Sequence, residues 1–329
     1  MVLLLSKNEV NSLLSMRECI DAVEEAFREF ATGAATMPNR VSLPIPVQGG
    51  WLGVMPAYLA RTGSLTTKIV TVYPQNLATH RIPNVLAVVL LNDVETGRIQ
   101  AIIEGSQITA MRTGAVSGVA TKYLARANSN RVGLFGAGGQ SRKQLQAIRE
   151  VRKIDSVKVY DTNKDLAKSF ALEVLAEKTI AVSVASEPDE VVQNSDIIVT
   201  ATTSPTPVFN GRLLRPGTHI NAIGAYTPTA REVDSVTVSS SKIVVDSIEA
   251  ALEEAGDILI PLKEGVLRRE SIWGELGEVI TGRKRGRTSE DETTLFKSVG
   301  LGIQDAAVAK LVFQKAQKFG VGTRFNFEK

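Results

Sequence analysis

Hydrophobic residues near the start of the chain recur at the spacing of a helix. Ser6 with Glu9, and Ser15 with Glu18, each have the S-x-x-E spacing of a capping box, which begins a helix. After the second box, apolar residues recur every three or four positions until Gly33. The chain is therefore predicted to begin with two helices, the first short and the second amphipathic, with Ile20, Val23, Phe27 and Phe30 on its apolar side.

From Val41 to about Glu104 the pattern changes to short β-rich pieces divided by Pro, Gly and Asn. Residues 65–73 and 85–93 are two such strands, and residues 95–103 form a hairpin with the preceding strand, turning near Gly97. The first hundred residues are therefore predicted to be α+β, with a mostly antiparallel sheet.

A helical period returns at about Ser106, and from there short apolar strands alternate with helices. This alternation is typical of a parallel, doubly wound α/β sheet. A last helix, residues 302–320, closes the chain. The strands of the α/β region are predicted at 131–136, 156–161, 180–184, 196–202, 219–224 and 242–246.

Length and composition indicate the number of domains and argue against nucleic-acid and membrane binding. The 329 residues exceed what one core usually serves, so two domains are expected. A net charge of +3 gives no reason to expect nucleic-acid binding, and the basic run at 282–287 is followed by acidic residues, which favours a solvated loop. Cys19 is the only cysteine, and no apolar run reaches the length of a membrane span or forms a signal peptide. These features predict a cytoplasmic protein without membrane partners.

A glycine-rich segment joins the first strand of the α/β region to its helix. Gly136 and Gly138 give G-x-G, and Ser141 stands at the third small-residue position. Asp161 ends the next strand, where a carboxylate binds the ribose 2′-hydroxyl of NAD. This strand–turn–helix context predicts dinucleotide binding. Asp161 favours NAD, whereas Lys164 could offset the 2′-phosphate of NADP. Asp161 could also be the N-cap of the following helix, and both roles could hold at once.

Three basic residues of the first domain stand in apolar or neutral surroundings: Arg40, Lys68 and Arg112. They form either structural ion pairs or a pocket for a substrate carboxylate, and spacing alone does not decide between the two. His219 falls in a predicted strand and is expected to be a satisfied core residue. No cluster has the spacing of metal ligands, which leaves hydride transfer as the leading chemistry.

Long motifs lie along most of the chain. They are "GGWLGVMPAYLA" (49–60), "LTTKIVTVYP" (65–74), "MRTGAVSGVATKYLA" (111–125), "GAGGQS" (136–141), "INAIGA" (220–225) and "SVGLGIQDAAVAKLV" (298–312). These motifs resemble the ornithine cyclodeaminase/μ-crystallin family. The resemblance implies a homodimer and a Rossmann domain, residues 118–304, inserted in a discontinuous α+β domain for substrate binding and dimerisation, residues 1–117 with 305–329.

The resemblance also assigns site residues. Arg40, Lys68 and Arg112 correspond to the family's substrate-carboxylate residues. Tyr226 stands where cyclodeaminases and archaeal alanine dehydrogenases carry an aspartate that the ketimine reductases lack, and we expect it to cover the substrate. The cofactor-binding residues are predicted to be Asn84, Thr113, Gly136, Ala137, Gly138, Gly139, Gln140, Asp161, Thr162, Thr202, Ile223 and Val299.

Together with the dinucleotide motif, the resemblance implies an NAD(P)H-dependent oxidoreductase of the ketimine reductase type. Its substrate would be Δ1-pyrroline-2-carboxylate or Δ1-piperideine-2-carboxylate, and its product L-proline or L-pipecolate. The cofactor would be NAD(H), with NADP(H) left open. The alternatives are an ornithine cyclodeaminase, an alanine dehydrogenase, and a non-enzymatic protein that binds a small molecule.

Overall fold

The computed structural model describes residues 1–327 and divides the chain into two compact units. Unit 1 contains residues 1–112 and the chain from residue 301 onward, and unit 2 contains residues 113–300. The boundaries predicted from sequence lie a few residues further along the chain. Because α4 (Gly105–Leu124) begins in unit 1 and ends in unit 2, the first boundary falls inside a helix.

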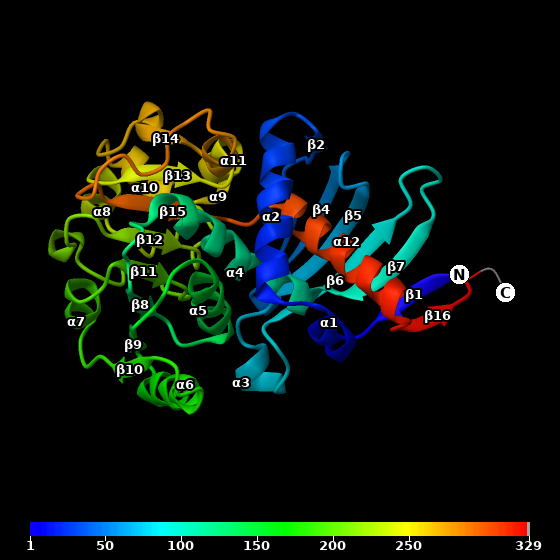
Figure 1. Ribbon diagram of the computed structural model, residues 1–329, viewed down its shortest axis with the longest axis horizontal. Helices are drawn as coiled ribbons and strands as arrows, with labels where there is room; N and C mark the ends of the chain where they lie inside the picture. Colours follow the sequence, from blue (N-terminus) through cyan, green and yellow to red (C-terminus); the bar gives the residue numbers. More distant parts are fainter. Residues whose placement is uncertain (328–329) are drawn as a thin grey trace. The chain divides into compact units, whose positions relative to one another are not determined.

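Unit 1 is built on a mainly antiparallel sheet, as predicted (Figure 1). Its strands lie in the order β16-β1-β7-β6-β5-β4-β2, and β3 also pairs with β4. The pair β1 and β7 is parallel, and the other pairs are antiparallel. The strands are β1 (Val2–Leu5), β2 (Ala35–Thr36), β3 (Val41–Ile45), β4 (Gly50–Leu59), β5 (Ser64–Val72), β6 (Val85–Asn92), β7 (Ile99–Glu104) and β16 (Thr323–Phe325).

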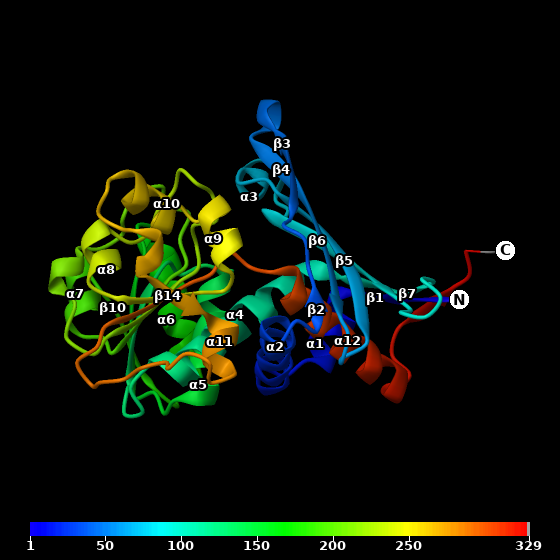
Figure 2. The same cartoon turned by 90° about the horizontal axis from the view of Figure 1, so that it is seen from above.

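Helices cover this sheet. Both predicted capping boxes are present, and they begin α1 (Lys7–Leu13) and α2 (Met16–Ala31). The apolar side of α2 buries Ile20, Val23 and Phe27, while Phe30 is half-buried. Helix α12 (Gly302–Phe319) packs against α2 and against β4, β5 and β6 (Figure 2), so the last helix of unit 1 contacts its first half. A short α3 (Asn76–His80) and a 3-10 turn (Pro46–Gln48) connect strands.

The ends of the chain differ from the prediction. A strand, β1, precedes the two helices, and it pairs with both β7 and β16. The prediction that the chain begins with a helix and closes with one is therefore wrong at both ends. "VLLL" is too short to show a period, and its strand partners lie far away in the sequence.

Unit 2 carries an all-parallel sheet with the strand order β10-β9-β8-β11-β12-β15-β13-β14. The first six positions have the Rossmann arrangement, with its switch point between β8 and β11. The predicted fold class is confirmed. The strands are β8 (Arg131–Phe135), β9 (Ser156–Tyr160), β10 (Ala181–Val184), β11 (Ile197–Thr200), β12 (His219–Ala222), β13 (Lys242–Val245), β14 (Ile272–Glu275) and β15 (Thr294–Lys297).

A core of apolar side chains lies between this sheet and its helices, and it includes Leu134, Val159, Phe170 and Val199. The sequence prediction missed two strands, β14 and β15: β15 lies between β12 and β13, and β14 pairs with β13 at the edge of the sheet. The helices are α5 (Gly139–Val151), α6 (Lys164–Ala176), α7 (Pro188–Gln193), α8 (Ser235–Ser239), α9 (Ile248–Glu254), α10 (Gly256–Lys263) and α11 (Leu276–Ile280), with 3-10 turns at Gly211–Leu213 and Arg269–Ser271.

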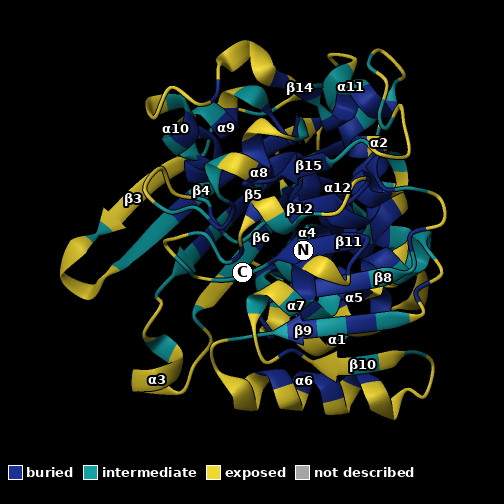
Figure 3. Ribbon diagram, turned by 90° about the vertical axis from the view of Figure 1, so that its left-hand side faces the viewer, coloured by how far each residue is buried: buried dark blue, intermediate teal, exposed yellow. Residues whose placement is uncertain are grey.

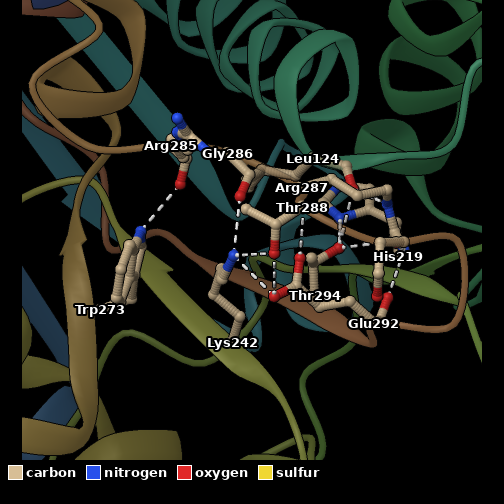
Figure 4. A network of polar contacts seen from close by, with 11 residues as sticks. Leu124, His219, Lys242, Trp273, Arg285, Gly286, Arg287, Thr288, Glu292 and Thr294 are labelled. Atoms are coloured by element: carbon tan, nitrogen blue, oxygen red, sulfur yellow. Dashed lines mark hydrogen bonds and ion pairs between the residues drawn. The ribbon is translucent and has the colours of Figure 1, made fainter.

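Hydrogen bonds connect the basic run at 282–287 to other segments of unit 2 (Figure 4). Trp273 Nε1 donates to the carbonyl of Arg285 at 2.9 Å, and Lys242 Nζ donates to that of Gly286 at 2.8 Å. Arg287 Nε donates to the carbonyl of Leu124 at 2.7 Å, at the end of α4. The prediction of a solvated loop is therefore wrong for Arg287, which caps a helix. His219 is fully buried with both ring nitrogens bonded, as expected of a core residue.

Candidate functional site

The buried cations of unit 1 meet at one carboxylate. Lys68 occupies an inward position of β5, in line with Ser64 and Thr66, where an apolar side chain would be expected. Its Nζ lies 2.6 Å from Asp305 Oδ2, and Arg112 Nε lies 3.2 Å from Asp305 Oδ1. All three side chains are buried, because α12 brings Asp305 onto the sheet face and α4 brings Arg112.

The pKa of Lys68 and the balance of charge distinguish this cluster from an ordinary ion pair. Burial lowers the pKa of Lys68 to about 7; Asp305 opposes this shift, and the nearby charges of Arg112 and Arg40 add to it. Two cations, Lys68 and Arg112, share one carboxylate, Asp305, so the cluster carries an excess of positive charge when both are protonated. A buried charge is costly without compensation, so the cluster favours an additional anion.

Gln304 belongs to the same cluster. Its Oε1 accepts a hydrogen bond from Arg112 Nη1 at 2.8 Å, while its buried Nε2 has no hydrogen-bond partner among the described residues. Sequence reasoning missed both Gln304 and Asp305. A signal was present, because both are polar residues within the first half of α12, residues 302–309, which is otherwise apolar and is buried throughout.

The glycine-rich segment of unit 2 forms a tight turn between β8 and α5. Gly136 has a φ of 94°, and an added Cβ would lie 2.6 Å from the carbonyl oxygen of Ala201, so the turn requires glycine. A Cβ at Gly138 or Gly139 would meet open space, which leaves the backbone accessible at the start of the helix. Ser141 Oγ donates to the Gly136 carbonyl at 2.6 Å and holds α5 close to the turn.

Asp161 lies beside this turn at the end of β9. Its carboxylate accepts from the amides of Ala137 and Asn163, each at 2.8 Å. Asn163 is the N-cap of α6, so the alternative role of Asp161 as the cap is wrong. Arg142, which the sequence did not single out, donates to the carbonyls of Ala137 and Gly138 and pairs with Glu173.

Other predicted residues of unit 2 follow the carboxyl ends of the neighbouring strands. Thr202 follows β11, Ile223 and Tyr226 follow β12, and Val299 follows β15. Because all these strands are parallel, their ends lie along one edge of the sheet, where open α/β sheets bind ligands. Of the remaining predicted residues, Asn84 is in unit 1, Thr113 is in the first turn of unit 2 and Thr162 follows Asp161.

The residues present fit a dinucleotide. The turn presents accessible backbone, and Asp161 supplies a carboxylate at the expected strand end. Within residues 1–327, the buried Oε1 of Gln140, beside the start of α5, has no hydrogen-bond partner. The Ala137 amide is bonded to Asp161, so it is not available for a phosphate in this arrangement.

Residues 2–319 match the model of the Ornithine cyclodeaminase/mu-crystallin family. The chain belongs to this family. The family prediction is thereby confirmed, and the match spans both units.

The alignments with individual relatives cover nearly the full length of this chain and of each relative. A Δ1-pyrroline-2-carboxylate reductase of Bacillus cereus is 39% identical over 327 residues, covering 99% of this chain and 100% of that protein. An alanine dehydrogenase of Archaeoglobus fulgidus is 42% identical over 325 residues, covering 99% and 98%. The structure of Thermococcus litoralis Δ1-pyrroline-2-carboxylate reductase in complex with NADH and L-proline has a TM-score of 0.96 at 48% identity, covering 98% of this chain and 100% of that chain.

Two further features are absent from the part of the chain that the structure describes. Among residues 1–327, no group of three or more His, Cys, Asp or Glu side chains has a metal-binding arrangement. Within the same residues, none of the helices combines the length and apolar character that crossing a membrane requires.

Proposed function

We propose that this protein reduces a cyclic imino acid, Δ1-pyrroline-2-carboxylate or Δ1-piperideine-2-carboxylate, to L-proline or L-pipecolate with NADH. The observation that carries the proposal is the buried cluster of Lys68, Arg112 and Asp305, whose excess positive charge suits a small carboxylate. The dinucleotide turn and the similarity to a reductase solved with NADH and L-proline support it.

Each basic residue has a role in this proposal. Arg112 and Arg40 bind the substrate carboxylate, and Lys68 makes a third contact with it. When bound, NADH would supply a hydride to the imine carbon beside the carboxylate, and with one proton the imine nitrogen would become an amine nitrogen. Lys68, with a pKa of about 7, is suited to donate a proton to that nitrogen at neutral pH. Most of the rate enhancement then comes from holding the imine carbon in place.

NADH rather than NADPH is the proposed reductant, because Asp161 places a negative charge at the end of β9. The carboxylate keeps acceptor capacity for a ribose diol beyond its two backbone bonds, and it repels a 2′-phosphate. The proposed cofactor contacts are Asn84, Thr113, Gly136, Ala137, Gly138, Gly139, Gln140, Asp161, Thr162, Thr202, Ile223 and Val299.

Alanine dehydrogenase is the second candidate, because the Archaeoglobus fulgidus relative is 42% identical to this chain. It would use the same carboxylate cluster for pyruvate and the same cofactor. Tyr226 favours the imine reductase over the alanine dehydrogenase. A carboxylate is better suited than a phenol to accept a proton from an amino group and to return it.

One substrate screen tests the proposal. NADH oxidation is followed with each cyclic imine and with pyruvate plus ammonia, and ornithine is incubated separately without added reductant. We expect kcat/KM for a cyclic imine to exceed that for pyruvate plus ammonia by at least about tenfold. Oxidation with pyruvate plus ammonia alone would establish alanine dehydrogenase, release of ammonia from ornithine would establish a cyclodeaminase, and binding without turnover would establish a binding protein.

We also propose that the enzyme is a cytoplasmic homodimer that associates through unit 1. Most of β3 is exposed (Figure 3). Its residues Val41 and Leu43 are 65% and 55% exposed, and Val47 in the following turn is 90% exposed. Exposed apolar side chains gathered on an edge strand are usually covered by a partner.

A further inference from the structure

A second buried charge cluster lies in unit 2, and the proposed reaction does not use it directly. It contains Glu232, in the segment between β12 and α8, Asp257 in α10, and Lys297, the last residue of β15. All three side chains are fully buried. Burying three charges is costly, so the contacts that they make indicate what the cluster does.

Glu232 joins the ends of two neighbouring strands. Its Oε2 accepts from Thr200 Oγ1 at 2.8 Å, at the end of β11, and from the Gly224 amide at 2.6 Å, after β12. Its Oε1 accepts from the Thr202 amide at 2.6 Å. One carboxylate therefore fixes the segment after β11 relative to the segment after β12.

Gly224 gives independent evidence of this close fit. A Cβ at Gly224 would lie 2.4 Å from Glu232 Oε1 and 2.4 Å from the Thr202 carbonyl oxygen. No side chain other than hydrogen fits there, because the carboxylate occupies the space between the two segments.

The other two charges hold Glu232 in place. Asp257 Oδ1 accepts from the amides of Glu232 and Val233, at 2.6 and 3.0 Å. Lys297 Nζ lies 2.7 Å from Asp257 Oδ2 and donates to the carbonyl of Ala225, next to Tyr226. The segments after β11, β12 and β15 are thus connected through one buried network.

We propose that Glu232 is a positioning residue for the nicotinamide half of the cofactor. A Rossmann sheet binds the two halves of a dinucleotide on either side of its switch point. Asp161, after β9, belongs to the adenosine side, so β11 and β12 belong to the nicotinamide side. Glu232 orients Thr202 and Ile223 without touching the ligand. This inference rests on the proposed function, because it assumes that unit 2 binds NADH.

Burial and the nearby negative charge of Asp257 raise the pKa of Glu232, while its bonds to backbone amides favour the carboxylate. The ionised group has enough acceptor capacity for Thr202, Gly224 and Thr200 together. A glutamine at this position would turn an NH₂ group toward at least one of these donors, so the segments could not keep their arrangement.

The test compares two ligands and two matched variants. NADH and ADP-ribose, which lacks nicotinamide, are titrated calorimetrically into wild type, Glu232→Gln and Asp196→Asn. Asp196 is a suitable control because it is a buried carboxylate at the opposite end of β11, bonded to Arg126, Arg131 and the Asn130 amide. Asp196→Asn is expected to lower the melting temperature and leave both affinities within about twofold of wild type.

For Glu232→Gln we expect NADH affinity to fall by about tenfold or more while ADP-ribose affinity stays within about twofold. Equal losses for the two ligands, or no loss in a folded protein, would overturn the role of Glu232. Thr200→Val, which removes one donor and keeps the carboxylate, provides the same comparison if Glu232→Gln does not fold; an unchanged affinity ratio in Thr200→Val would then overturn it.

The outcomes separate this inference from the proposed function. A wild type that does not bind NADH refutes the proposed function. A wild type that binds NADH and reduces the imine, together with an unchanged affinity ratio in Glu232→Gln, refutes only the positioning role.

Discussion

Lys68 is a titratable cation buried against the middle of a sheet, and its pKa of about 7 makes its charge depend on pH in the physiological range. Below pH 7 it is protonated and can both attract a carboxylate and donate a proton. We therefore expect kcat/KM for the imine to fall as the pH rises through about 7. A bound carboxylate adds a negative charge beside Lys68 and raises its pKa, so kcat should fall at a higher pH than kcat/KM.

The control for Lys68 is Lys68→Arg, whose guanidinium stays charged throughout the range. The decline in kcat/KM near pH 7 should disappear in this variant even if its overall rate is lower. A decline that persists at the same pH in Lys68→Arg would assign the titration to the imine itself.

Tyr226 is half-buried in the segment after β12, and it is the predicted cover of the substrate. Tyr226→Phe keeps the ring, so it should keep imine reduction within about tenfold of wild type. Tyr226→Asp introduces a charge and removes the ring, so imine reduction should be lost; trace release of ammonia from ornithine is the further readout. A loss of several orders of magnitude in Tyr226→Phe would instead make the phenol the proton donor.

The sequence identified the cations of the carboxylate cluster but not the residues that organise them. Lys68 and Arg112 were recognisable because a charge interrupts an apolar strand or a small-residue helix. Their partner Asp305 lies 237 positions from Lys68, and no local pattern reports a contact at that separation. Structural ion pairs and a carboxylate pocket were treated as alternatives, yet the structure has an ion pair with an excess of positive charge.

At the scale of elements, the segment from β9 to α6 determines the proposed cofactor preference. Asp161→Ser removes the carboxylate that would repel a 2′-phosphate, so the ratio of kcat/KM for NADPH to that for NADH should rise by about tenfold, or ~1.4 kcal/mol. Asp165→Ser is the matched control, because Asp165 is exposed in the first turn of α6 and should leave the ratio unchanged. A wild type that already prefers NADPH would contradict the role of Asp161.

Most elements of unit 2 could be predicted because each short apolar strand is followed by a helix or turn signal. β15 was missed because "TLFK" is only four residues long and ends in Lys297, a charge that the sequence gives no reason to bury. β1 was missed for a similar reason. Both strands depend on partners that are distant in sequence, so tertiary pairing rather than local propensity makes them strands.

At the scale of the whole molecule, long motifs allowed the family and the order of the elements to be predicted, and the same resemblance implied a homodimer without indicating which surface associates. The exposure of β3 bears on that surface. β3 is exposed on both faces of the strand, although its sequence, VSLPI, is largely apolar. Pro44 removes one backbone donor from this edge, which reduces pairing with another strand but leaves the apolar side chains uncovered.

The proposed dimer can therefore be tested at β3. Leu43→Lys places a charge among the exposed apolar side chains, so it should weaken the dimer by at least about tenfold in dissociation constant, as measured by sedimentation velocity over a range of concentrations. Leu172→Lys is the matched control: Leu172 is 69% exposed on α6 of unit 2, and the same substitution there should leave association unchanged. ADP-ribose affinity should stay the same in both variants, because neither residue belongs to the dinucleotide turn. A wild type that sediments as a monomer would refute the dimer, and a Leu43→Lys protein that associates as tightly as wild type would place the interface elsewhere.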